Sequence, residues 1–254
     1  MSVNNAFGCV AGYVLYDCGK VIIAYDALAV IVNPSNPVSQ LTRQQLEAIF
    51  RLGLFENRYV TEAGIKKTVF TKKHQQTALE IARRSIVLLK NESLLPVDTR
   101  KFKKILVTGP NANNQSIMGD WVFEQPEKNV STILEGIKEE ASGTQINYVD
   151  VGWNMRALDS AKIEEAIQTA KSSDLAIVIV GEDSFRQHWK EKTCGENRDR
   201  MDITLWGKQD YLVESIYKTG VPTIVILING RPLATRWIAE NTTGSILHNI
   251  LQEI

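Results

Sequence analysis

The sequence predicts an α/β fold in which a doubly wound, mostly parallel sheet lies between helices. Two segments, Leu175–Gly181 and Thr223–Asn229, are apolar at nearly every position, which is typical of strands that are buried on both faces. Amphipathic helical patterns precede and follow both segments. Because parallel strands are joined by right-handed helical crossovers, this alternation predicts a sheet with helices on both sides.

The composition excludes several classes of partner. The 254 residues suffice for one large or two small domains, and 44% of them are hydrophobic. Twenty-nine basic residues balance 29 acidic ones, so we expect neither nucleic acid nor a membrane as a partner. The three cysteines and three histidines show no metal-ligand spacing, so we expect no metal and no cofactor. The N-terminus does not resemble a signal peptide, which leaves the compartment open.

The first third of the chain has weaker patterns. Residues 21–24 and 27–32 are β-rich, and residues 43–50 are predicted to form a helix. The polar segment that follows is predicted to be a linker over residues 51–76. A helix is then predicted over residues 74–89, with one buried stripe formed by Ala78, Ile81, Ala82, Ser85 and Leu89.

The α/β alternation continues to the end of the chain. Each apolar run of five to seven residues is separated from the next by a helical pattern with one apolar face. The predicted elements are a strand at 105–109, a helix at 132–140, a strand at 146–151, a helix at Ser160–Lys171, the strand Leu175–Gly181, a helix at 206–218, the strand Thr223–Asn229, a short helix at 233–240 and a last apolar run at 245–251.

The loop at residues 182–200 is the strongest candidate for a functional site. Loops at the carboxyl ends of parallel strands build the sites of such folds, and this loop is unusually long. It combines the rings of Phe185 and Trp189 with many charges, which is the chemistry of a sugar site, although a charged loop can also be merely solvated. Cys194 has no histidine close by and is expected to be a buried thiol rather than a nucleophile.

Several motifs resemble those of the second domain of family 3 glycoside hydrolases, and they occur in the same order. A further segment, residues 51–57, resembles the exit from that family's first domain, a (β/α)₈-type barrel. The matching motifs are Ala-Arg-Arg-Ser-Ile-Val-Leu-Leu-Lys-Asn-Glu-Ser-Leu-Leu-Pro at 82–96, Ile-Leu-Val-Thr-Gly-Pro-Asn-Ala at 105–112, Met-Gly-Asp-Trp at 118–121, Val-Ile-Val-Gly-Glu at 178–182, Gly-Glu-Asn-Arg-Asp-Arg at 195–200 and Leu-Ile-Asn-Gly-Arg-Pro-Leu at 227–233.

The resemblance implies a retaining β-glycosidase of the β-glucosidase type that acts on a β-glucoside or an oligosaccharide. In this family the barrel supplies an aspartate nucleophile and the second domain supplies a glutamate acid/base, whose place is taken here by Glu196. The residues implied to bind substrate are Phe185, Arg186, Trp189 and Arg198. Arg198, with Asp199 and Arg200, could instead hold the loop by ion pairs.

The sequence departs from the family pattern at both ends. Residues 21–50 resemble a fragment of a bacterial phosphate-binding protein of a transport system, where the barrel should stand. We therefore predict a phosphate-binding-protein fragment at 1–50, a linker at 51–76 and a truncated family domain at 77–254, with a sheet that is incomplete at its C-terminal edge and open to pairing. A chain without the nucleophile is expected to be inactive. The alternatives are a non-catalytic carbohydrate-binding or interaction module and a phosphate- or solute-binding fragment.

Overall fold

The computed structural model describes residues 3–4, 40–42, 44 and 60–249 of the chain, which divides into two compact units, Met1–Gln75 and Gln76–Ile254. In the first unit, strands β1 (Val3–Asn4) and β2 (Gln40–Leu41) pair antiparallel. The predicted phosphate-binding-protein fragment, with its strands and helix, falls almost entirely outside the described residues, as does the predicted barrel exit at residues 51–57.

The predicted linker contains regular structure. Helix α2 (Glu62–Thr68) begins at Thr61, whose hydroxyl accepts a hydrogen bond from the backbone N–H of Gly64 at 3.1 Å. Helix α3 (Lys72–Ser85) begins in the same stretch and continues beyond it. The predicted linker is therefore helical over Glu62–Thr68 and from Lys72 onward, and no residue of either helix is buried.

The helix predicted over residues 74–89 is right in its first part and wrong in its last. The chain leaves α3 at Ser85 and continues as strand β3 (Ile86–Asn91). Four consecutive apolar residues, Ile-Val-Leu-Leu, suit a strand as well as a helix, and pairing with another strand decides between the two. The predicted buried stripe is also wrong, because α3 has no buried residue and two members of the stripe, Ile81 and Leu89, are each 51% exposed.

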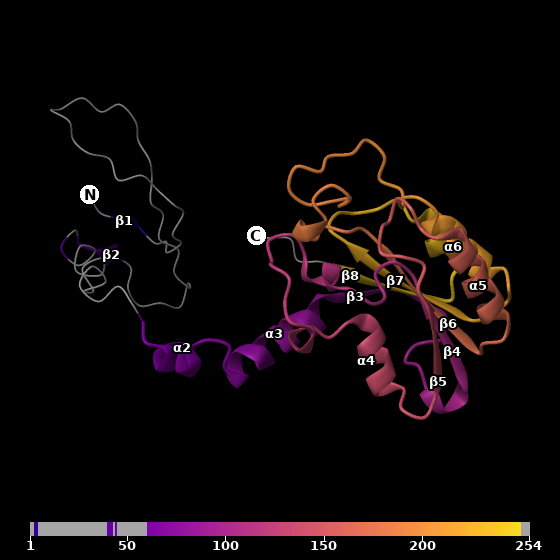
Figure 1. Ribbon diagram of the computed structural model, residues 1–254, viewed down its shortest axis with the longest axis horizontal. Coiled ribbons are helices and arrows are strands. Elements are labelled where there is room, and N and C mark those ends of the chain that lie inside the picture. Colours follow the sequence, from indigo (N-terminus) through magenta and orange to yellow (C-terminus); the bar gives the residue numbers. More distant parts are fainter. Residues whose placement is uncertain (1–2, 5–39, 43, 45–59, 250–254) are drawn as a thin grey trace. The chain divides into compact units, whose positions relative to one another are not determined.

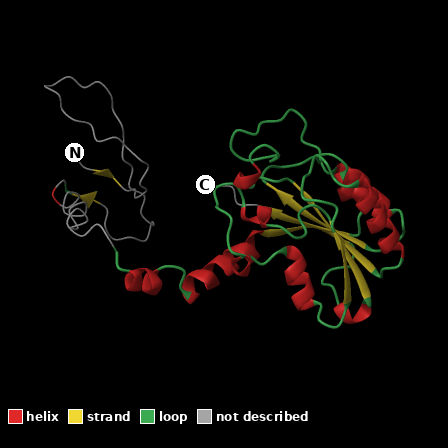
Figure 2. Cartoon of the chain, in the orientation of Figure 1, coloured by secondary structure: helices red, strands yellow, loops and turns green. Residues whose placement is uncertain are grey.

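The second unit contains a six-stranded sheet that confirms the predicted α/β class (Figures 1 and 2). Along the sheet the order is β3, β8, β7, β6, β4, β5, and every neighbouring pair is parallel except β3 with β8. The remaining strands are β4 (Lys104–Thr108), β5 (Gln145–Val149), β6 (Leu175–Gly181), β7 (Thr223–Asn229) and β8 (Gly244–Asn249).

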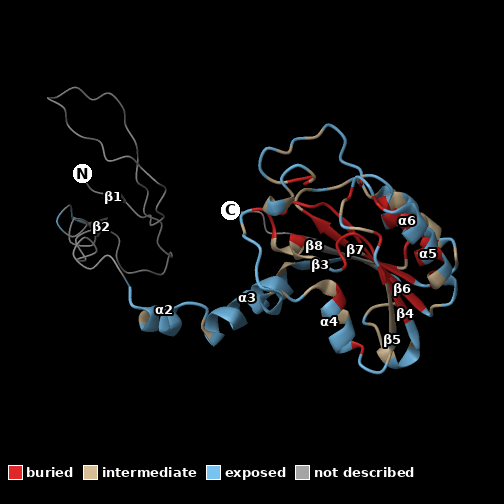
Figure 3. Ribbon diagram, in the orientation of Figure 1, coloured by how far each residue is buried: buried red, intermediate tan, exposed pale blue. Residues whose placement is uncertain are grey.

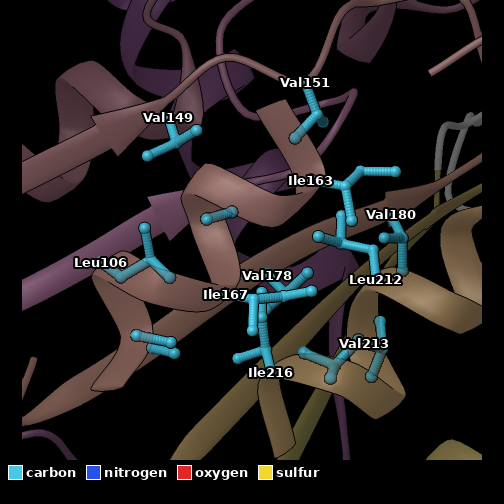
Figure 4. Packing of buried hydrophobic residues seen from close by; sticks show 14 of the residues in the cluster. Leu106, Val149, Val151, Ile163, Ile167, Val178, Val180, Leu212, Val213 and Ile216 are labelled. Carbon is cyan, nitrogen blue, oxygen red and sulfur yellow. The ribbon is translucent and has the colours of Figure 1, made fainter. Parts of the chain in front are cut away.

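The sheet is covered on both faces, as the doubly wound prediction requires. Successive residues of β6 alternate between two apolar clusters: Val178 packs with the helices α5 (Ser160–Lys171) and α6 (Gln209–Tyr217), whereas Ile177 and Ile179 pack with α4 (Ile133–Glu140). Figure 4 shows the first cluster between α5, α6 and the strands, and Figure 3 shows that burial concentrates on the central strands.

Helices α4 and α5 begin within one residue of their predicted positions, whereas α6 begins at Gln209 rather than at residue 206. Helix α4 has a capping box, in which the Thr132 hydroxyl accepts from the Glu135 N–H and the Glu135 carboxylate accepts from the Thr132 N–H. Helix α5 begins after Asp159, and its predicted apolar face is buried. Helix α7 (Arg236–Asn241) is shorter than predicted. None of the described helices is long and apolar enough to cross a membrane.

The open sheet edge is not at the C-terminal strand. Strand β8 lies between β7, to which it is parallel, and β3, to which it is antiparallel. Strand β3 turns back from the start of the domain and covers the edge that was expected to be open. The edge position therefore belongs to β3 itself, in which Ile86 and Leu88 are 48% and 56% exposed.

Candidate active site

The candidate site lies at the carboxyl ends of β4 and β6, beyond the sheet, where the loop at residues 182–200 is the orange loop of Figure 1. Gly109 and Gly181 turn the chain out of these two strands with φ angles of 113° and 146°. A Cβ on Gly181 would lie 2.0 Å from the backbone oxygen of Ile228, and one on Gly109 would lie 2.0 Å from that of Ile179. Only glycine fits this close approach, so both loops begin in fixed positions.

Glu196 is held at its backbone and at one carboxylate oxygen. Its N–H donates to Oδ2 of Asp120 at 2.7 Å, and its Oε2 accepts from Nη2 of Arg186 at 2.7 Å. The Glu196 side chain is nevertheless 42% exposed. The carboxylate is therefore oriented by the protein while its side chain remains accessible to solvent.

The Asp120 carboxylate that holds the Glu196 backbone belongs to a buried ion pair with Lys192. The side chain of Asp120 is 2% exposed, and its two oxygens accept from Nζ of Lys192 at 3.1 and 3.0 Å. Nε of Arg186 lies 3.6 Å from Oδ1 of the same carboxylate. Because Asp120 belongs to the loop after β4 and Lys192 to the loop after β6, their pair ties the two loops together. A buried charge needs such a partner.

Two indole rings flank these charges. The guanidinium of Arg186 lies 3.8 Å from the ring centroid of Trp121, and Nζ of Lys192 lies 4.2 Å from that of Trp189. Trp121 and Trp189 are 55% and 41% exposed, so part of each ring is open to solvent. Exposed rings beside an oriented carboxylate suit a sugar, whose C–H faces stack on rings while its hydroxyls need polar partners.

The structure brings together most of the residues that the sequence assigned to the site. Arg186 and Trp189 lie around Glu196, and Arg198 donates through Nη2 to the backbone oxygen of Trp189. Phe185 differs, because it is only 5% exposed and its ring meets the His188 ring edge-on at 5.3 Å. The site also contains three residues that were not predicted from the sequence: Asp120, Trp121 and Lys192. The Met-Gly-Asp-Trp motif at 118–121, in the loop after β4, was the sequence signal that could have identified Asp120 and Trp121.

A second cluster of charged side chains connects the two ends of the loop: Glu182, Arg200 and Arg231. The Glu182 carboxylate is buried, and its Oε1 lies 3.4 Å from both Nη1 of Arg200 and Nε of Arg231. Burial raises the pKa of Glu182 despite these two arginines. The alternative reading of Arg198 and Arg200 as loop-holding residues is consistent with these contacts, since Nη2 of Arg231 also donates to the backbone oxygen of Arg198 at 2.6 Å. Asp199 has no ion pair among the described residues.

Cys194 is expected to resist alkylation in the folded protein. It is fully buried, as the sequence predicted, and burial raises the pKa of its thiol far above the usual range. Iodoacetamide at pH 8 should leave the peptide containing Cys194 unmodified in native protein and modify it in urea, as read by mass spectrometry. Rapid native labelling of this cysteine would show that the loop opens readily.

Among the described residues, no group of three or more histidine, cysteine, aspartate or glutamate side chains is arranged to hold a metal ion.

The fold and the site define a doubly wound α/β domain that presents an oriented carboxylate close to partly exposed indoles. The chain belongs to glycosyl hydrolase family 3. The model of the family's C-terminal domain matches residues 86–253. This match supports the second-domain assignment that the motifs implied.

The relatives are glycosidases that are much longer than this chain. A beta-xylosidase of Formosa agariphila is 38% identical over 213 residues, which are 80% of this chain and 28% of the relative. A periplasmic beta-glucosidase of Salmonella typhimurium is 30% identical over 249 residues, covering 83% of this chain and 31% of the relative. The chain therefore spans less than a third of each of these two relatives.

Solved structures show the same fold. The beta-glucosidase from Listeria innocua in complex with isofagomine superposes with a TM-score of 0.68 at 25% identity, covering 82% of this chain and 28% of that one. A beta-glucosidase involved in saponin metabolism from intestinal bacteria gives a TM-score of 0.68 at 26% identity, covering 82% of this chain and 33% of that one.

Proposed function

We propose that this chain carries the acid/base half of a retaining β-glycosidase and that Glu196 is the general acid/base. The observation that carries the proposal is the state of the Glu196 carboxylate. It is half-exposed at the carboxyl edge of the sheet, while its backbone N–H is fixed on the buried Asp120 and its Oε2 is fixed on Arg186. An acid/base needs this combination of fixed orientation and access to substrate.

In the first step, Glu196 gives its proton through Oε1 to the glycosidic oxygen as the bond from that oxygen to the anomeric carbon breaks. At the same time, the nucleophile that the family resemblance implies for the other domain forms a bond to the anomeric carbon. In the second step, the Glu196 carboxylate takes a proton from water as the water oxygen attacks that carbon and releases the nucleophile. Glu196 is thereby protonated again, so the proton balance closes over one cycle.

The substrate class follows from the ring surfaces and from the relatives. Trp121 and Trp189 offer partly open indoles for the neutral sugar or aryl group on the leaving side, with Arg186 and Arg198 as hydrogen-bond donors beside them. The relatives are named β-xylosidases and β-glucosidases. We therefore propose a β-linked xyloside or glucoside as substrate.

A domain exchange tests this function. Residues 86–249 would replace the matching domain of the Formosa agariphila β-xylosidase, and hydrolysis of methyl β-xyloside and methyl β-glucoside would be measured. We expect the exchanged enzyme to hydrolyse at least one of them, whereas the 254-residue chain alone and the remainder of the xylosidase alone should not, because a retaining mechanism needs two carboxyl groups. A folded exchanged enzyme without activity on either glycoside would contradict the proposal.

A further inference from the structure

We propose that the chain has a second carbohydrate-binding pocket, which takes one neutral sugar ring at the carboxyl ends of β4, β5 and β6. The pocket has a volume of about 250 Å³, below the roughly 300 Å³ at which pockets for larger drug-sized ligands begin. This size suits one monosaccharide unit. The residues that line it are Pro110, Asn113, Asn114, Gln115, Glu124, Tyr148, Asp150, Trp153, Phe185 and His188.

The pocket lies at the point of the sheet where open α/β folds bind their ligands. From β4 the chain moves outward to β5 and then returns to the other side of β4 as β6. The loops after β4 and β6 therefore diverge and leave a crevice between them. Pro110 follows β4, Asp150 follows β5 and Phe185 follows β6, so all three loops contribute to the pocket wall.

One polar group of the pocket is an oriented imidazole. Nδ1 of His188 lies 2.6 Å from Oδ2 of Asp183, which is 3% exposed, so the buried carboxylate fixes the orientation of the ring. This contact uses only one ring nitrogen, and Nε2 has no hydrogen-bond partner among the described residues. Phe185 packs edge-on against the same ring. The arrangement presents one positioned nitrogen to a ligand hydroxyl.

The other polar groups supply both donors and acceptors. Oδ1 of Asn113 accepts from the Thr132 hydroxyl at 3.0 Å, which leaves the Asn113 amide NH₂ for a ligand. Burial, and after it the Asp150 carboxylate, raise the pKa of Tyr148 to about 12, so the Tyr148 hydroxyl keeps its proton. The exposed Glu124 adds an acceptor. A sugar hydroxyl both donates and accepts, and it can use such a mixed set.

Trp153 provides the stacking surface. Its ring lies 3.9 Å from that of His188 at an interplanar angle of 22°, so the imidazole holds the indole in place. Trp153 is still 41% exposed. A pre-positioned, partly open indole beside hydroxyl-binding groups is what a sugar ring requires.

The charge of the pocket selects a neutral ligand. Among the described residues that line it, two are carboxylates and none is lysine or arginine. A phosphate, sulfate or uronate would be repelled by these two carboxylates, and no lysine or arginine of the lining would offset that repulsion. The arginines and the lysine around Glu196 are absent from this lining, and none of the lining residues is hydrogen-bonded to Glu196. The pocket therefore goes beyond the proposed catalytic function.

A titration followed by NMR tests the pocket on the whole 254-residue chain. The indole N–H signals of Trp153, Trp121 and Trp189 would be followed while methyl β-xyloside or methyl β-glucoside is added. We expect the Trp153 signal to shift and saturate. The variants Glu124→Ala and Asn113→Ala should each weaken the affinity read at Trp153 by about tenfold, the loss of one good ligand hydrogen bond. Lys190→Met, an exposed residue of the same loop that does not line the pocket, is the control and should leave that affinity unchanged.

The possible outcomes separate this pocket from the function proposed for Glu196. A Trp153 signal that does not move while Trp121 or Trp189 shifts would overturn the second pocket and leave the Glu196 proposal standing. A saturating Trp153 shift that both variants leave unchanged would also overturn it, because binding would then occur elsewhere. Conversely, an inactive domain exchange together with a saturating Trp153 shift would remove the catalytic proposal alone.

Discussion

Replacing Glu196 by glutamine in the domain-exchanged enzyme is expected to lower kcat/KM for methyl β-xyloside by about 10²–10⁴-fold, the usual contribution of a general acid. Glutamine keeps the size and one oxygen of the side chain but has no carboxyl proton to give to the leaving oxygen. The backbone N–H of residue 196 would still donate to Asp120, so the loop should keep its position.

The leaving group provides the decisive control. The dinitrophenolate group of a dinitrophenyl xyloside needs little protonation as it leaves, so the first step with this substrate should be much less affected by Glu196→Gln. Added azide should restore turnover, because it attacks in place of the water molecule that no longer has a general base. Asp199→Asn, an exposed carboxylate of the same motif without an ion pair among the described residues, is the matched control and should leave kcat/KM nearly unchanged. Equal losses on both glycosides, without rescue, would show that Glu196 is structural.

The central strands could be predicted from sequence because burial alone determines them. Leu175–Gly181 and Thr223–Asn229 are apolar on both faces, and the structure has strands with these bounds. The run Ile86–Asn91 could not be assigned in the same way, because its apolar residues extend a preceding helical pattern. Only the antiparallel pairing with β8, more than 150 residues later in the chain, makes it a strand.

The site was predictable where it depends on a motif and unpredictable where it depends on contacts distant in sequence. Glu196, Arg186 and Trp189 come from one loop, and that loop stood out by its length and composition. Asp120 is separated from Lys192 by 72 residues, so the sequence alone does not show that these two charges form an ion pair. Lys192 also looks like a solvated charge in a polar loop, whereas the structure buries it completely. No periodicity in the sequence distinguishes a buried, paired lysine from a solvated one.

Replacing Lys192 by methionine is expected to lower the free energy of unfolding by about 3–5 kcal/mol, because the Asp120 carboxylate would stay buried without its principal cation. Urea unfolding followed by fluorescence measures this loss. Lys190→Met, an exposed neighbour, is the control and should change stability by less than about 0.5 kcal/mol. The double variant Asp120→Asn with Lys192→Met should recover part of the loss, since no charge is then stranded. A loss below about 1 kcal/mol for Lys192→Met would mean that water reaches Asp120 and that the pair does not anchor the Glu196 loop.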